Sequence, residues 1–425
     1  MRIGDRVTTR SGERWRVDRV LGEGSQGRVL RIASVDRPGR LAALKRYEAR
    51  TYDPWQSAAI ERLVERGSPG PMFLWPREVL TFDDGSFGYV MPLMPAGFVS
   101  LSTMIRGELD IRPSTALRIA VGLAHGFLQL HALGFCYRDI SFGNVLAHPV
   151  TAQVLICDND NVGVDGASRT AVLGTRRFMA PEVVRGEAVP STQTDLHALA
   201  VLIFSVLMVQ HPLLGRRELA YACLDQSAER TLFGDSPVFI FDPDDHSNAP
   251  DPDEHPGVAA NWQLHPTGIR NLFVEAFGAG LHRPSRRVRE SVWRGELARA
   301  LDMIATCPTC GSENFYDRQP CHCWSCQSAV VSPPVLRLPR ATLVLSGTAC
   351  VYQHHLARDY DVSEVVGRVV RHPRTARWGL RNESTTTWTL QFEGRRGEVP
   401  PGRTAALVEG ATLDFGAVTA TFGRA

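Results

Sequence analysis

A glycine-rich turn followed by one isolated lysine constrains the N-terminal part of this chain more than any other feature. The turn is Gly22-Glu23-Gly24-Ser25-Gln26-Gly27, it has strand-forming residues on both sides, and Lys45 follows its last glycine by eighteen residues. Lys45 is the only lysine among 47 basic residues, and all the others are arginine. Glycines let backbone amides approach a phosphate closely, and an ammonium group can contact several phosphate oxygens at once. The two features together predict a β-hairpin that binds a phosphorylated ligand.

Length and composition predict a protein of two or three domains. The chain has 425 residues, of which 44% are hydrophobic, and domains usually hold about 100 to 200 residues. The longest apolar stretch, 198–209, is too short to cross a bilayer and predicts a buried helix, and the charged first 20 residues do not resemble a signal peptide. We therefore expect a cytoplasmic protein with no membrane partner. Residues 327–425 carry 12 arginines against 8 acidic residues, a bias too weak to indicate nucleic-acid binding.

Three later segments carry acidic and amide side chains in a fixed order. Asp139 and Asn144 follow an amphipathic segment, 114–133, which we expect to form a long helix. Asp158 follows a short apolar run that is typical of a buried strand, and residues 180–182 read Ala-Pro-Glu. Each of these residues alone is more often a turn former than a functional group, so their order and spacing carry the interpretation.

Together the motifs resemble the eukaryotic-like (Hanks-type) serine/threonine protein kinases of bacteria over about residues 10–303. The turn at 22–27 matches G-x-G-x-x-G, residues 137–144 resemble R-D-x-x-x-x-N, and residues 180–182 are an unaltered A-P-E. The resemblance implies an α+β fold with the two lobes of a protein kinase, ATP with Mg²⁺ or Mn²⁺ as cofactors, and a protein substrate that is phosphorylated on a hydroxyl group. It further implies that the chain phosphorylates itself and acts in bacterial signalling.

The resemblance also assigns roles to individual residues. It implies a catalytic set of Lys45, Asp139, Asn144 and Asp158, in which Asp139 accepts the proton of the substrate hydroxyl while Asn144 and Asp158 bind the metal. Glu61 is the expected helix partner of Lys45, with Glu65 as the alternative. Asp195 is expected to brace the catalytic loop, and Arg283 to pair with Glu182. The ATP-binding residues implied are Gly22, Gly24, Gly27, Val29, Ala43, Lys45, Glu61, Met91, Met94 and Leu146.

Three departures from the family pattern leave other functions open. The segment 158–160 reads Asp-Asn-Asp in place of D-F-G, Tyr137 replaces the histidine of H-R-D, and Ser141 replaces a lysine that neutralises the transferring phosphate. A pseudokinase, or a nucleotide-binding scaffold that recruits partners, is therefore the alternative to an active enzyme. A small-molecule phosphotransferase is a third hypothesis, but such enzymes lack the A-P-E segment.

Regulatory phosphorylation is expected between Asp158 and Glu182. Arg138, beside the catalytic aspartate, can bind a phosphate on Ser168, Thr170 or Thr175. Thr175 has a competing role, because the resemblance implies that a threonine at this position forms a hydrogen bond with the catalytic aspartate.

Farther along the chain, residues 232–265 are rich in prolines and carboxylates, which favours a solvated surface insert over a docking segment.

Two C-x-x-C motifs, separated by twelve residues, indicate a metal site. Cys307 and Cys310 form the first motif, and Cys323 and Cys326 form the second. Two such motifs give the four thiolates of a tetrahedral Zn²⁺ ion in a structural ribbon. Cys321 and the adjacent His322 are spare donors. A redox pair is disfavoured because neither motif lies in a thioredoxin-like βαβ pattern.

The last part of the chain, after Pro333-Pro334, reads as short strands separated by Gly, Pro and Asn turns, which predicts a small all-β sandwich. Segments 380–384, 399–402 and 410–416 resemble the later half of a forkhead-associated domain, although its phosphothreonine clamp is not evident.

The predicted domains are a kinase domain at 1–303 (N-lobe 1–92, C-lobe 96–303, insert about 232–265), a zinc ribbon at 304–330 and a β-sandwich at 335–425. This order resembles the kinase of bacterial clusters that also encode a PP2C-type phosphatase and a von Willebrand A-type protein, which are the partners it implies.

Overall fold

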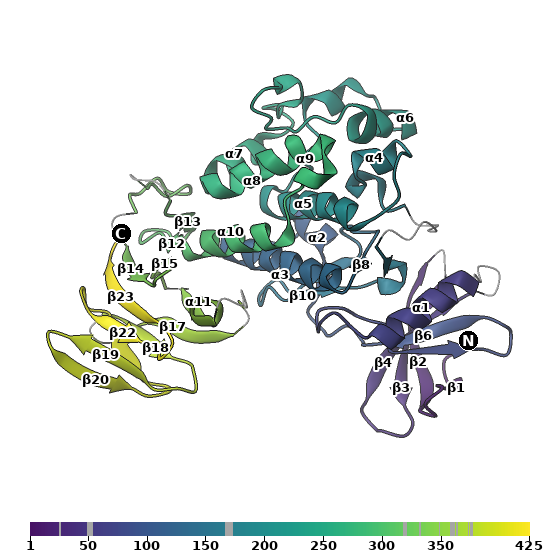
Figure 1. Ribbon diagram of the computed structural model, residues 1–425, viewed down its shortest axis with the longest axis horizontal. Coiled ribbons are helices and arrows are strands. Elements are labelled where there is room, and N and C mark those ends of the chain that lie inside the picture. The colour runs from purple at the N-terminus through teal and green to yellow at the C-terminus, as the bar shows by residue number, and fades with distance from the viewer. Residues whose placement is uncertain are drawn as a thin grey trace.

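The computed structural model describes residues 1–425 except 25–26, 49–53, 166–172, 318–320, 331–332, 348, 358–361, 363, 373 and 375–376. Its N-terminal lobe is an antiparallel six-stranded sheet in the order β1-β2-β3-β4-β6-β5, with one helix beside it (Figure 1). The alternating apolar residues of β2 and β3 bury Trp15 and Ile32 on one face of the sheet. The elements are β1 (Arg6–Thr8), β2 (Arg14–Gly24), β3 (Gly27–Ser34), β4 (Leu41–Tyr47), α1 (Pro54–Arg66), β5 (Glu78–Thr81) and β6 (Phe87–Met91).

The second lobe is mainly helical and is built around α5 (Thr192–Met208), which is buried from Thr194 to its last residue. The predictions of a long helix at 114–133 and of a buried apolar helix near 198–209 are confirmed by α3 (Pro113–Ala132) and α5. The remaining elements are β7 (Val99–Ser100), α2 (Leu101–Ile105), β8 (Phe135–Cys136), β9 (Val145–Ala147), β10 (Val154–Ile156), β11 (Gly163–Val164), α4 (Pro181–Val184), α6 (Gln226–Arg230), α7 (Pro256–Leu264), α8 (Thr267–Phe277), α9 (Ala279–His282) and α10 (Glu290–Asp302).

The segment 232–265 is an integral part of this lobe, and the prediction of a solvated surface insert is wrong. Phe239 is buried and packs against Phe204 of α5, with ring centroids 5.7 Å apart. Trp262 of α7 stacks on Phe241 at 4.3 Å. Its carboxylates do lie at the surface, but six aromatic and aliphatic side chains of the same segment are buried in the core: Leu232, Phe233, Phe239, Ile240, Val258 and Trp262.

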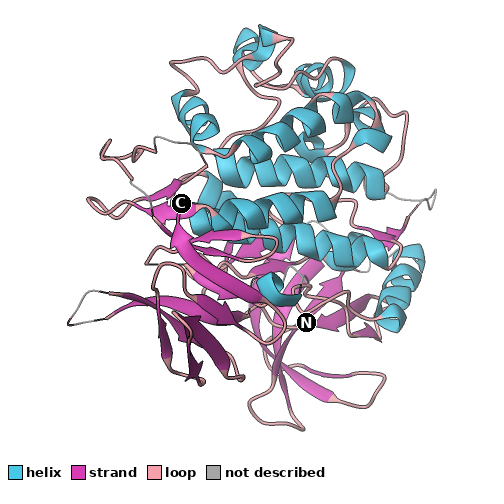
Figure 2. Ribbon diagram, turned by 60° about the vertical axis from the view of Figure 1, so that its left-hand side comes forward, coloured by secondary structure: helices cyan, strands magenta, loops and turns pink. Residues whose placement is uncertain are grey.

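The C-terminal part contains a small ribbon followed by two sheets. The ribbon pairs β12 (Ile304–Thr306) with β13 (Glu313–Phe315). One sheet has the order β15-β14-β23-β22-β19-β20 and the other β16-β17-β18-β21, which confirms the expectation of an all-β unit (Figure 2). The strands are β14 (Pro334–Arg337), β15 (Thr342–Val344), β16 (Cys350–Tyr352), β17 (Val365–Arg371), β18 (Trp378–Asn382), β19 (Trp388–Phe392), β20 (Arg395–Val399), β21 (Thr404–Ala406), β22 (Thr412–Asp414) and β23 (Thr419–Arg424), with the helix α11 (His354–Ala357) after β16.

Polar contacts attach both C-terminal units to the helical lobe. The carboxylate of Glu313 in the ribbon accepts hydrogen bonds from the backbone N (2.8 Å) and the hydroxyl (2.9 Å) of Ser114, in the first turn of α3. His355 of α11 lies 2.9 Å from the carboxylate of Asp302, at the end of α10. Among the described residues, no helix combines the length and apolarity that crossing a membrane requires.

Candidate active site

The glycine-rich turn forms the connection between β2 and β3, as predicted. Gly22 and Gly24 lie in β2 with open space where a Cβ atom would be, so a ligand can approach the backbone there. Gly27 is different, because a Cβ atom on it would lie 2.0 Å from the carbonyl oxygen of Arg46 in β4. Close strand packing therefore requires this third glycine. Of the other residues predicted to contact ATP, Ala43 and Met91 are neighbours in the β4–β6 ladder.

The two predicted metal ligands are brought together by strand pairing. Val145 pairs with Ile156 in the β9–β10 ladder, so the residues just outside that pair, Asn144 and Cys157, are adjacent. The backbone N of Cys157 donates to the carbonyl oxygen of Asn144 at 3.0 Å. Asp158 comes next, in the left-handed conformation with φ 55°. The ladder thus places the Asn144 amide and the Asp158 carboxylate at the same edge, and both offer the oxygen donors that Mg²⁺ prefers.

The carboxylate of Asp139 is held on both of its oxygens. Thr175 donates its hydroxyl hydrogen to Oδ1 at 2.8 Å, and Asn144 donates from Nδ2 to Oδ2 at 3.2 Å. Asn144 also donates to the backbone carbonyl of Asp139 at 2.9 Å, which leaves its amide oxygen for a cation. The loop itself is braced by Asp195 at the start of α5, which accepts from the backbone N of Tyr137 and of Arg138, the latter at 3.0 Å. The position expected for Asp195 is therefore confirmed.

Two departures from the family motifs have compensating contacts. Tyr137 is fully buried, and its hydroxyl donates to the carbonyl oxygen of Cys157, directly before Asp158. This tyrosine therefore connects the loop that carries Asp139 to the turn that begins at Asp158. Asn159 is also buried, and its amide donates to the carbonyl oxygen of Ile156 at 3.0 Å. Ser141 is buried as well, and its uncharged side chain supplies no cation at this position.

Lys45 lies between two carboxylates of the Asp-Asn-Asp segment. Its Nζ atom is 2.5 Å from Oδ1 of Asp158 and 2.7 Å from Oδ2 of Asp160. Burial acts to lower the pKa of Lys45, but Asp160 and Asp158 outweigh it, and the pKa is raised. The pKa of Asp158 is also raised, by burial first and by its neighbour Asp160 second, with Lys45 opposing both.

Glu61 does not meet Lys45, which contradicts the prediction made for this residue. It lies in α1 but forms an ion pair at 2.8 Å with Arg10, and 38% of its side chain is exposed. Glu65, the alternative, is exposed. Asp160, which does meet Lys45, was not among the predicted site residues. A usable signal was present, because Lys45 and Tyr47 are two residues apart on one strand and therefore point to the same side, where both meet this carboxylate.

Glu182, the glutamate of the Ala-Pro-Glu segment, forms a buried, bidentate ion pair with Arg287. Both oxygens of Glu182 accept from the guanidinium group of Arg287 at 2.8 Å, and the side chain of Arg287 is only 2% exposed. The prediction of Arg283 as the partner is therefore wrong. A short turn, Pro284–Arg286, separates the two arginines and carries the chain back toward Glu182 before Arg287.

The predicted phosphorylation sites have different outcomes. Ser168 and Thr170 lie outside the described residues. Thr175 is described, and its hydroxyl is engaged with Asp139, which supports the competing role over a role as phosphate acceptor. Arg138, the predicted phosphate ligand, directs its guanidinium group toward Gly163 and Val164 of β11.

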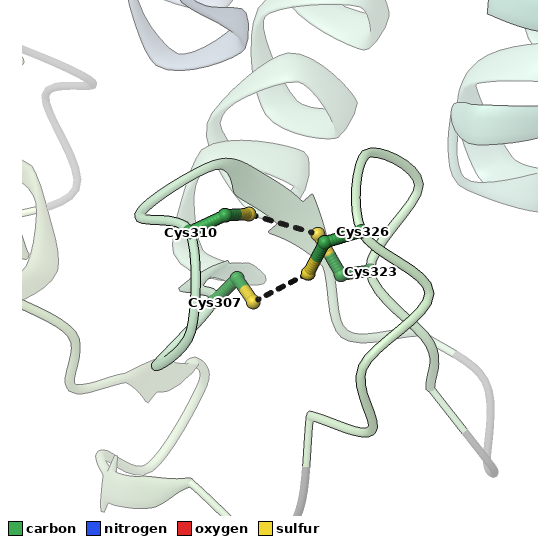
Figure 3. A group of neighbouring side chains, drawn as sticks. All are labelled: Cys307, Cys310, Cys323 and Cys326. Carbon is green, nitrogen blue, oxygen red and sulfur yellow. Dashed lines mark hydrogen bonds between the residues drawn. The ribbon is translucent and has the colours of Figure 1, made fainter.

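The four cysteines of the two C-x-x-C motifs converge at the end of the ribbon (Figure 3). The Sγ atoms of Cys307 and Cys326 are 3.6 Å apart, as are those of Cys310 and Cys323. A tetrahedral zinc ion with Zn–S bonds of about 2.3 Å requires sulfur atoms about 3.8 Å apart, so the donor set fits such an ion. Cys321 lies apart from this set and donates from Sγ to the carbonyl oxygen of Phe315 at 3.7 Å.

Comparison with known proteins agrees with this geometry. Residues 15–236, just over half of the chain, match the family model described as protein kinase domain. The chain belongs to the protein kinase family. Among curated kinases, it is 27% identical over 207 residues to serine/threonine-protein kinase PkaB of Streptomyces coelicolor, which covers 46% of this chain and 49% of the relative. It is 32% identical over 125 residues to protein kinase MCK1 of Saccharomyces cerevisiae (28% and 33% of the two chains) and 27% identical over 269 residues to protein kinase C delta type of Mus musculus (60% and 38%). The kinase chain therefore spans between a third and a half of the length of these relatives.

Proposed function

We propose that this chain is an ATP-dependent serine/threonine protein kinase. The observation that carries the proposal is the double anchoring of Asp139, whose oxygens accept from Thr175 and Asn144. A carboxylate fixed in this way faces the incoming hydroxyl group in one orientation. Such positioning accounts for much of the rate acceleration in enzymatic phosphoryl transfer. The bacterial relative named a serine/threonine-protein kinase supports the same activity.

In the proposed reaction, the oxygen of a substrate Ser or Thr attacks the γ-phosphorus of ATP. A new P–O bond forms, the bond from the γ-phosphorus to the β,γ-bridging oxygen breaks, and ADP leaves with that electron pair. Asp139 accepts the proton of the hydroxyl group. Lys45 positions phosphate oxygens beneath the glycine-rich turn. The Glu182–Arg287 pair, buried behind the Ala-Pro-Glu segment, fixes the platform on which a peptide would lie.

A divalent cation, Mg²⁺ or Mn²⁺, would be held by Asn144 and Asp158. Such an ion neutralises the charge that develops on the β- and γ-phosphates. Because Ser141 supplies no cation to the transferring phosphate, this kinase depends more on its metal than relatives with a lysine there do. Of the residues predicted to contact the nucleotide, Val29, Met94 and Leu146 remain part of this proposal, whereas Glu61 does not, because it pairs with Arg10 at the surface.

ATP turnover and autophosphorylation of the full chain, measured beside an Asp139→Asn variant, test the function. Asp139→Asn keeps the size of the side chain and removes its capacity to accept a proton. We expect phosphorylation to fall by roughly 100-fold or more in this variant, in line with the contribution of a general base. Equal signals from the two proteins would refute the kinase reaction and favour a nucleotide-binding scaffold.

We further propose that Cys307, Cys310, Cys323 and Cys326 hold one structural Zn²⁺ ion, and that the C-terminal sheets form a forkhead-associated-like module. The convergence of the four sulfur atoms supports the first assignment, and the two stacked antiparallel sheets support the second. A PP2C-type phosphatase and a von Willebrand A-type protein are the proposed partners. Metal analysis of the purified chain should find one zinc per molecule.

A further inference from the structure

Asp160 is the most buried charged group of the active site. Its side chain has no exposed area, whereas 37% of the Asp158 side chain is exposed. Oδ2 of Asp160 accepts from Lys45 and from the hydroxyl of Tyr47. Oδ1 is buried and has no hydrogen-bond partner in the part of the chain that the structure describes. Lys45 and Tyr47 therefore supply the counter-charge and the hydrogen bonds that a carboxylate buried this deeply requires.

The two carboxylates near Lys45 differ in what a bound metal would do to them. Asp158, the partly exposed one, is the proposed metal ligand, and an ion bound there would compete with Lys45 for its oxygens. Asp160 sits deeper, against Tyr47, and remains available to Lys45 when Asp158 is engaged. A lysine that contacts phosphates needs such a second anion, because its flexible four-carbon chain otherwise samples many positions.

Helix α1 supplies no carboxylate for this task among the described residues. Glu61 is committed to Arg10 at the surface, and Glu65 is exposed. The helix nevertheless packs against the turn Asn159–Asn161 that contains Asp160. The backbone also permits an aspartate at this position, because the left-handed residue of the turn is Asp158 and not Asp160.

We propose that Asp160 is the residue that positions Lys45 for phosphate binding, in place of a glutamate from helix α1. The assignment rests on the proposed kinase function. It explains why a carboxylate occupies the third position of the Asp-Asn-Asp segment, where family members have glycine. It also means that the lysine follows the movement of the metal-binding turn rather than that of the helix, since its partner belongs to that turn.

The single lysine makes a direct test possible. Amine acylation of the full chain, followed by peptide mass spectrometry, reports on the ε-amine of Lys45 alone, because no other lysine is present. At one fixed pH, added ATP and Mg²⁺ should protect Lys45 of the natural chain from acylation, and this protection should fall severalfold in Asp160→Asn and in Asp160→Gly, since the ammonium group is no longer held where the phosphates bind. Glu61→Gln, the same acid-to-amide change on the helix, should leave this protection as it is in the natural chain.

Kinetics on the same variants test the positioning role. Asp160→Asn and Asp160→Gly should each lower kcat by about 10- to 100-fold. The double variant Lys45→Met with Asp160→Asn should have the same kcat as Lys45→Met alone, because the losses from two residues that act as a unit do not add. Asp36→Asn, an exposed carboxylate of the same lobe, is the matched control. Two chemically different replacements of Asp160, each checked for folding by circular dichroism, guard against a variant that fails to fold.

The outcomes separate the two proposals. Full activity in Asp160→Gly, independent losses in the double variant, or protection of Lys45 by ATP that is lost with Glu61 and not with Asp160 would each overturn the assignment. If the natural chain transfers no more phosphate than Asp139→Asn, the kinase function fails, while the labelling profile still decides whether Asp160 is the partner that holds Lys45.

Discussion

A buried histidine behind the catalytic loop predicts a specific dependence of stability on pH. His131, near the end of α3, lies 3.1 Å from Oδ2 of Asp195 through Nε2 and contacts the carboxylate of Glu290 through Nδ1. Burial acts to lower its pKa, but hydrogen bonds with the two carboxylates outweigh burial and raise the pKa to about 9. The imidazolium form therefore belongs to the folded state over the physiological pH range.

The sign and size of the effect follow from this shift. The folded chain binds a proton at His131 more tightly than the unfolded chain, in which the pKa is about 6.5. The contribution of protonated His131 to the free energy of unfolding is fully present below pH 6.5 and is lost as the pH rises from 6.5 through 9. The difference of about 2.5 between the two pKa values corresponds to at most about 3.4 kcal/mol of the free energy of unfolding.

Denaturant unfolding of the natural chain and of His131→Gln at a series of pH values from 6 to 9.5 measures this contribution. We expect the difference in free energy of unfolding between the two proteins to be largest at pH 6 and to shrink steadily toward pH 9.5. His246→Gln, at an exposed position, is the matched control for losing a histidine. A difference that stays constant with pH, or that grows as the pH rises, would refute the argument that His131 is charged between its two carboxylates.

Three further predictions concern the contacts that hold the site in place. Tyr137→Phe should lower the free energy of unfolding by about 1–2 kcal/mol, because the carbonyl of Cys157 loses the hydrogen bond from the buried tyrosine; denaturation beside Tyr221→Phe, a more exposed tyrosine, checks this. Glu313→Gln should cost about 1 kcal/mol, because the first turn of α3 loses a charged acceptor, and an unchanged melting temperature would contradict it. Cys323→Ser should abolish zinc retention, whereas Cys321→Ser should leave one zinc per chain as measured by metal analysis.

The sequence allowed the order of the active-site elements to be predicted, because each motif is local. The glycine-rich turn, the Asp139 loop and Asp158 depend on residues that are close in sequence, and the strand pairing of β9 with β10 then joins two of them. The insert at 232–265 could not be predicted in the same way. Its composition is polar, but Phe239 packs on Phe204 of α5, 35 residues earlier in the chain, and composition does not reveal that contact.

The partners of single charged residues were the least predictable part of the site. Arg283 and Arg287 lie four residues apart, and only the path of the intervening turn decides which of them reaches Glu182. Glu61 has a suitable spacing from Lys45, but Arg10, 51 residues earlier, offers it an ion pair at the surface. Spacing alone defines which residues can meet, and competition among several acids and bases decides which of them do.

Helix α3 connects the ribbon to the chemistry at the catalytic loop. Its first turn receives the carboxylate of Glu313 from the ribbon, and near its last residue His131 contacts Asp195, which braces the loop that carries Asp139. Glu290, the first residue of α10, meets the same histidine, and α10 packs along α3 before it leads into the ribbon. If the ribbon holds the proposed zinc ion, removing that ion would release the acceptor at one end of α3 while the charged cluster at the other end remains. Zinc removal should therefore destabilise the catalytic lobe gradually, by loosening this helix from its N-terminal end, rather than by acting on Asp139 directly.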